Sequence, residues 1–364
     1  MDAMPVLKMG HLNIDPPFIL GGMGVRSTDH HLVSAVANCG MAGTIASVGL
    51  VRRECRGQAY VEESSAGLVE EIRLSREASP KGIIGVNIMV ALTNYDELVR
   101  TSVEEKVDYI ISGAGLPLGL PALTKDSGIC LIPIVSSART AEIVCKRWWG
   151  RDKYVPDAIV VEGALAGGHL GLSREEVATW DEHTLETVCA EVISVARKYE
   201  AETGKHIPVI AAGGVFDGRD IARLFKIGVE GIQMATRFLA TDECSLPIQC
   251  KQLIVDAKQE DMAIINSPVG LPGRAVRNEL VRKIERGDRM PISCPFKCLR
   301  TCNPAEVPFC IAQALIAAHK GDENMGLIMA GANAYRIEKI VPVRQLVDDL
   351  IAETLAAMQQ DCAA

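Results

Sequence analysis

The amino-acid sequence predicts an α/β protein built around a (β/α)8 barrel, also called a TIM barrel. Eight mostly continuous apolar runs recur along the first 240 residues, and segments with helical periodicity separate them. Continuous apolar runs are typical of strands buried on both faces of a parallel sheet. Eight such strands alternating with helices favour a closed barrel over the alternative, a doubly wound open sheet. The predicted strands lie within 17–24, 41–49, 82–91, 107–115, 129–137, 157–163, 207–215 and 229–240.

Helix start and stop signals lie between these runs. Asp29, after Ser27 and Thr28, can cap a helix that Gly40 then stops. A longer helix is predicted to end before Gly204, and a short one before Gly228. Residues 50–80 are polar and predicted to be helical.

About 100 residues after the eighth strand do not continue the repeat. We expect 241–340 to form an inserted, mostly helical subdomain, and a helix within 341–364 to complete the barrel unit formed by 1–240. Barrel active sites lie at the C-terminal ends of the strands, so this insertion lies beside the site. It is predicted to act as a lid or substrate wall, the alternative being extra packing.

Composition excludes several classes of function. The formal charge of −8 and the aromatic content of 4% argue against nucleic-acid binding, so a small-molecule partner is expected. No run approaches the roughly 18 apolar residues of a membrane span, and the first residues lack a signal-peptide pattern. Twelve cysteines in 364 residues are too dilute for a disulfide scaffold, which predicts a cytoplasmic location. The oligomeric state stays open, a homodimer being one option.

Glycines gather where the predicted strands end. Without a Cβ atom they let the backbone approach a ligand, although they can also simply form tight turns. Gly213 and Gly214 precede residues 217–220 and a helix whose free N–H groups suit a phosphate, and Thr236 follows the next strand. This pattern predicts a phosphate cradle at the barrel mouth.

His169 is the candidate catalytic residue. It lies between glycines after a buried strand, and an imidazole there can move a proton or stabilise an anion. The alternative is a surface histidine. Glu162, at the end of the same strand, is either a second acid–base group or a strand-end hydrogen bonder. The other histidines are expected to be solvated or have no clear context: His11, His30, His31, His183, His206 and His319.

Several motifs taken together resemble the flavin-dependent nitronate monooxygenases. They are GGMG after the first strand, the AGGHLG loop, AAGGV followed by DGR, and QMATRF, and they cover most of residues 15–240. The same superfamily contains flavin-dependent enoyl-acyl-carrier-protein reductases and NAD(P)H:quinone reductases. The inosine-monophosphate dehydrogenase type is set aside, because no cysteine lies in these strand-end motifs. The sequence departs from relatives at Met234 and Ala235, where glycine is common.

The resemblance implies an FMN across the barrel mouth, with His169 facing the substrate. Gly22, Met23 and Gly24 would then pack along the flavin ring. The full set of residues that the resemblance assigns to cofactor binding is Gly22, Met23, Gly24, Asn87, Ser136, Glu162, Gly167, Gly168, Gly213, Gly214, Gln233, Met234, Ala235 and Thr236.

Three functions remain open at this point. The first is oxidation of alkyl nitronates with oxygen. The second is FMN-dependent reduction of enoyl thioesters or quinones, with NAD(P)H as electron donor. The third is a flavin-binding protein without turnover, or an electron carrier that uses a cysteine cluster.

Cys294, Cys298 and Cys302 recur every four residues, and Cys310 follows. On one straight helix the outer pair would lie about 12 Å apart, too far for one zinc ion. A shared metal or iron–sulfur cluster therefore requires the helix to break, as Pro295 could make it do. We favour reduced cysteines that pack as small apolar residues, with a redox-active pair as the next option.

Overall fold

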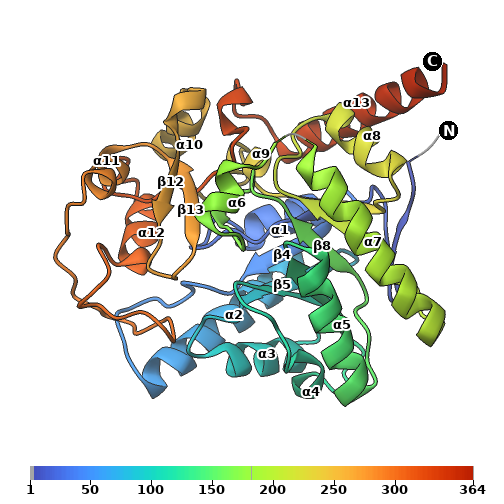
Figure 1. The fold of residues 1–364 in the computed structure, drawn as a ribbon. Coiled ribbons are helices and arrows are strands. Elements are labelled where there is room, and N and C mark those ends of the chain that lie inside the picture. Colours follow the sequence, from blue (N-terminus) through green and yellow to red (C-terminus); the bar gives the residue numbers. More distant parts are fainter. Residues whose placement is uncertain (1–3, 182, 364) are drawn as a thin grey trace.

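The computed structural model describes residues 4–181 and 183–363, and a closed barrel of eight parallel strands forms its centre (Figure 1). The last strand pairs with the first, which closes the barrel and excludes an open sheet. Each predicted strand is one of these eight, so the TIM-barrel prediction is confirmed. In order around the barrel they are β3 (Phe18–Leu20), β4 (Ala42–Ala46), β5 (Ile83–Met89), β6 (Tyr109–Gly113), β7 (Cys130–Val135), β8 (Ile159–Glu162), β10 (Val209–Ala212) and β11 (Gly231–Met234).

Helices follow most of the strands, and the predicted local signals place several of their ends. Asp29 caps α1 by accepting a hydrogen bond from the His31 N–H at 3.1 Å. Gly204 ends α7 with a φ of 72°, a left-handed conformation that glycine adopts without strain. The helices of the barrel region are α1 (His30–Ala37), α2 (Gln58–Ala78), α3 (Tyr95–Glu104), α4 (Leu120–Leu123), α5 (Ala138–Asp152), α6 (Arg174–Ala178), α7 (Thr184–Thr203), α8 (Gly218–Lys226) and α9 (Thr236–Leu239).

A small hairpin, β1 (Leu7–Met9) and β2 (Leu12–Ile14), closes the end of the barrel where the strands begin. Its buried side chains pack with the first residues of several strands, such as Tyr109 and Cys130. The sequence analysis did not predict this hairpin. Because it plugs the N-terminal end, a ligand can enter the barrel only at the opposite, C-terminal end.

The insertion lies to one side of the barrel in Figure 1 and is less helical than predicted. Its strands β12 (Met262–Asn266) and β13 (Pro272–Val276) form an antiparallel hairpin, and β9 (Gly168–His169), from the loop after β8, joins them as a third strand. The helical elements of the insertion are α10 (Ile248–Val255), η1 (Gln259–Asp261), α11 (Glu279–Glu285), α12 (Ile311–His319) and η2 (Ala334–Arg336).

The last helix, α13 (Val343–Ala363), packs against α8 as expected of a helix that completes the barrel, and residue 364 lies outside the described residues. The contact is close: a Cβ atom at Gly218 would lie 2.2 Å from the Thr354 nitrogen. In the ranges described, none of the helices combines the length and hydropathy that a membrane span requires.

Candidate active site at the barrel mouth

A cavity of about 260 Å³ lies at the C-terminal ends of the strands. Every site residue predicted from the sequence lines it except Ser136. The Ser136 hydroxyl instead donates a hydrogen bond to the Gly171 carbonyl at 2.8 Å, which braces the loop after β9. A role for Ser136 in cofactor binding stays a prediction.

Glycines make the floor of this cavity possible. A Cβ atom at Gly22 would lie 2.5 Å from the Asn87 Cβ, so the two residues can be neighbours only because one is glycine. Gly213 and Gly214 have φ angles of 83° and 99°, which other residues rarely adopt. The methyl group of Ala235, where relatives have glycine, faces Gly21 and would contact a Cβ there at 3.1 Å.

Polar groups along the cavity lack protein partners. The Gln233 side-chain oxygen is buried without a hydrogen bond. Within the described residues, the backbone N–H groups of Gly214, Val215 and Ala235 also make no hydrogen bond to the protein. Buried polar groups are nearly always satisfied, so the unpaired Gln233 oxygen indicates a polar ligand, and the unpaired N–H groups beside it suit the phosphate of a ligand such as FMN.

The helix after β10 does not offer its N–H groups to such a ligand. Asp217 accepts hydrogen bonds from the Arg219 and Asp220 N–H groups at 3.0 and 3.2 Å, and Glu353 of α13 accepts from Gly218 at 3.0 Å. The prediction that free N–H groups of this helix bind phosphate is therefore wrong. The glycine loop before it and the start of α9 are the places where unpaired N–H groups remain.

His169 is held over the cavity by the insertion. It pairs with Gly273 of β13, and its Nε2 lies 2.8 Å from the Ser267 hydroxyl. Burial lowers the pKa of His169 to about 4, so the imidazole is neutral at physiological pH. This arrangement places a neutral proton acceptor or donor at the mouth of the barrel, as the sequence predicted.

Two further buried ionisable groups support the same region. Burial raises the pKa of Glu162 to about 7, because a carboxylate is poorly solvated at the strand end. Arg274 of β13 donates hydrogen bonds to the Ala164 and Ala166 carbonyls, and burial lowers its pKa to about 10. Arg274 thereby fixes the loop that leads to Gly167 and His169.

His319 also lines the cavity, which the sequence analysis missed. It lies at the end of α12, its Nδ1 is buried without a partner, and burial lowers its pKa. The sequence spacing could have placed His319 here. Ile311, Leu315 and His319 are four residues apart, so they share one face of a helix, and this face lines the cavity.

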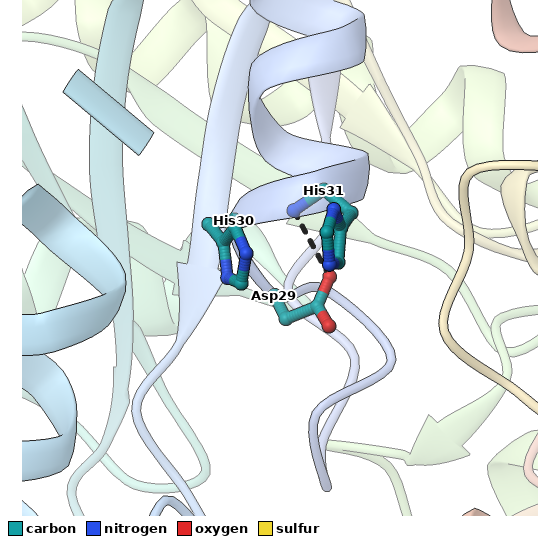
Figure 2. A group of neighbouring side chains, drawn as sticks. All are labelled: Asp29, His30 and His31. Carbon is teal, nitrogen blue, oxygen red and sulfur yellow. Dashed lines mark hydrogen bonds between the residues drawn. The ribbon is translucent and has the colours of Figure 1, made fainter. Parts of the chain in front are cut away.

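Among the described residues, the one trio of potential metal ligands within 4.8 Å of one another is Asp29, His30 and His31 (Figure 2). The Asp29 and His30 side chains already have hydrogen-bond partners in the protein. Asp29 caps α1 and accepts a hydrogen bond from the Ser245 hydroxyl, and His30 lies 2.9 Å from Glu71. The expectation that His30 is solvated is thus wrong, while His31 is exposed. Capping and an ion pair account for this group without a metal.

Comparison with known proteins agrees with the geometry. The family model described as nitronate monooxygenase matches residues 6–353. A Mycobacterium tuberculosis protein named (3aS,4S,5R,7aS)-5-hydroxy-7a-methyl-1-oxo-octahydro-1H-indene-4-carboxyl-CoA dehydrogenase is 30% identical over 278 residues, 76% of this chain and 68% of that protein. A probable nitronate monooxygenase of Staphylococcus saprophyticus is 28% identical and covers 78% of this chain and 81% of its own length. The structure of FabK from Thermotoga maritima has a TM-score of 0.73 and 28% identity, covering 95% of each chain.

Proposed function

Because the chain belongs to the nitronate monooxygenase family, a class of flavin-dependent oxidoreductases, we propose that it binds FMN at the barrel mouth and oxidises alkyl nitronates. The observation that carries this proposal is the neutral His169 held by Ser267 over a glycine-lined cavity whose polar groups lack protein partners. These are the features that a bound flavin and a small anionic substrate require.

The residues that would hold FMN fall into two groups, one beside the flavin ring and one at the phosphate. The glycines at 22, 24 and 167 let the chain pack closely against its neighbours around the cavity, and Gly168 has open space where a Cβ atom would lie. Asn87 and Gln233 line the cavity and offer side-chain amides to the polar edge of a flat ring. The unpaired N–H groups of Gly214, Val215 and Ala235 suit the phosphate. When bound, FMN supplies the electron acceptor for the substrate and the site of reaction with oxygen.

His169 handles the proton. If its Nε2–H donates to the Ser267 hydroxyl, Nδ1 is left without a proton and can accept the α-proton of a neutral nitroalkane. If the hydroxyl donates instead, the Nδ1–H can donate a hydrogen bond to the anionic nitro group of a nitronate. The lowered pKa of His169 leaves the imidazole neutral, so one ring nitrogen is free to accept while the other carries a proton to donate.

A second candidate function is redox chemistry on a CoA or carrier-protein thioester, with NAD(P)H as electron donor. The observation that favours it is the 30% identity to a protein named as a carboxyl-CoA dehydrogenase. Apolar residues from the insertion, among them Leu315, Ile316 and Leu327, line the same cavity and suit an acyl group.

Anaerobic mixing of the flavin-loaded protein with each substrate separates these functions. We expect an alkyl nitronate to bleach the oxidised flavin absorbance and air to restore it. Bleaching by NAD(P)H alone, followed by reoxidation with an enoyl-CoA, would support the second function and overturn the first. Failure of both compounds to bleach the flavin would leave a flavin-binding protein without turnover.

A further inference from the structure

The four cysteines at 294, 298, 302 and 310 converge in space. Residues 287–310 form no helix, so the straight helix that would have separated these cysteines does not exist. Instead the segment folds around a second cavity of about 250 Å³, which all four cysteines line. None of the four is fully buried, unlike Cys130, Cys145, Cys189, Cys244 and Cys250, which pack in the core as predicted. The expectation that these four are merely core residues is therefore not supported by their placement.

The segment is pinned to the barrel rather than loosely attached. The Thr93 N–H donates to the Cys298 carbonyl at 3.0 Å, and the Arg300 N–H donates to the Ala91 carbonyl at 3.0 Å. Arg56, just before α2, donates to the Cys294 carbonyl. These contacts between segments some 200 residues apart hold the cysteine backbone in position without any ligand.

Positively charged groups lie beside these cysteines. Cys310 is the N-cap residue of α12. Arg56 and Lys297 also line the cavity and bring two positive charges.

The spacing of the sulfurs distinguishes between metals. In a tetrahedral zinc site the sulfurs lie about 3.8 Å apart, because each Zn–S bond is about 2.3 Å long. Among the described residues, no three cysteine sulfurs lie within 4.8 Å of one another. In an iron–sulfur cluster the four thiolates bind more than one iron, so their sulfurs lie further apart.

We propose that Cys294, Cys298, Cys302 and Cys310 bind an iron–sulfur cluster. The cluster would lie behind the wall of the candidate active site, since Cys298, Leu299 and Ile311 line both cavities. This proposal does not depend on the substrate, because the cysteines do not belong to the predicted flavin site.

Elemental analysis of the full chain, produced with iron supplementation and purified without oxygen, tests the proposal. We expect iron and acid-labile sulfide in equal amounts, a broad visible absorption beyond the flavin bands, and a paramagnetic signal on reduction with dithionite. Zinc in a one-to-one ratio, or four thiols that react with a thiol reagent and take up no iron on reconstitution, would overturn it.

Two variants test whether the iron is bound by these four cysteines. Cys302→Ser should lose iron and sulfide, whereas Cys39→Ser, a half-buried cysteine outside the cluster, should keep both. Flavin content and the thermal melting curve report folding in each variant. Full iron content in a Cys302→Ser protein that folds and keeps its flavin would show that the proposed ligand set is wrong.

Discussion

His169 combines three properties that a catalytic side chain at this mouth needs. It lines the cavity, it bonds to Ser267, and burial lowers its pKa so that the ring is neutral. A neutral imidazole at the cavity can accept a proton from a substrate without first losing a proton of its own.

Replacing His169 with alanine should leave FMN bound while turnover falls by about 100-fold or more, the usual scale for acid–base work. Steady-state kinetics and the flavin content of the same preparation check this prediction. His31→Ala is the matched control, because His31 is an exposed histidine on α1 outside the cavity. Unchanged turnover in the His169→Ala protein would remove this residue from the mechanism.

Glu162 makes stability depend on pH. Its pKa rises from an ordinary value of 4.5 to about 7 on folding, so the folded state binds the proton more tightly. The free energy of unfolding should therefore fall by about 3 kcal/mol as pH rises from 4.5 to 7. His169 acts with the opposite sign, because its lowered pKa removes stability as pH falls below 6.5.

Comparison with Glu162→Gln isolates the carboxyl group, since both proteins keep His169. Denaturant unfolding at several pH values should show the variant gaining stability relative to the wild type between pH 4.5 and 7. A constant difference over that range would mean that Glu162 is ionised in the folded protein.

Among the structural elements, the three-stranded sheet of β9, β12 and β13 links the barrel to the insertion. Arg274 on β13 donates to two carbonyls of the loop before β9 from a buried position. Arg274→Met keeps an unbranched apolar stem but removes the guanidinium, which leaves the Ala164 and Ala166 carbonyls unsatisfied. We expect a loss of roughly 2–5 kcal/mol in unfolding free energy, because each unmet buried group costs about 1–3 kcal/mol.

Thermal or denaturant unfolding measures that loss, and Arg286→Met, at the exposed residue that follows α11, is the control. Stability equal to the wild type in Arg274→Met would show that these hydrogen bonds do not hold the loop.

These elements also show which parts of the fold and of the site could be predicted from the sequence. Long apolar runs and glycine pairs predicted the eight strands and the strand-end residues that line the cavity, because both signals are local, but not the residues that the insertion adds to its wall. The sheet of β9, β12 and β13 was missed, since its strands are short and β9 pairs with a strand about 100 residues later in the chain, His169 opposite Gly273. The N–H groups of α8 were expected to be free, but Asp217 caps two of them, a local signal that the sequence analysis did not use. The third pairs with Glu353, which lies on a helix whose packing no local pattern reveals.

The cysteine segment shows the same limit. A four-residue repeat favours a helix, yet hydrogen bonds to residues 91 and 93 hold this segment in an irregular path. Only the folded chain could show that four cysteines surround one cavity.

At the scale of the whole molecule, the cavity lies at only one end of the barrel, the end where the strands finish. The β1–β2 hairpin plugs the end where the strands begin, and the insertion contributes α12 and Phe296 to the wall at the other end. The candidate catalytic histidine, the proposed glycine cradle and the proposed cluster therefore gather on one side of a single scaffold.

The amount of FMN released when the purified chain is denatured tests the central claim most directly. The account predicts close to one FMN per chain, either as purified or after incubation with FMN and removal of the excess. A folded, monodisperse protein that retains no FMN after such incubation would contradict it.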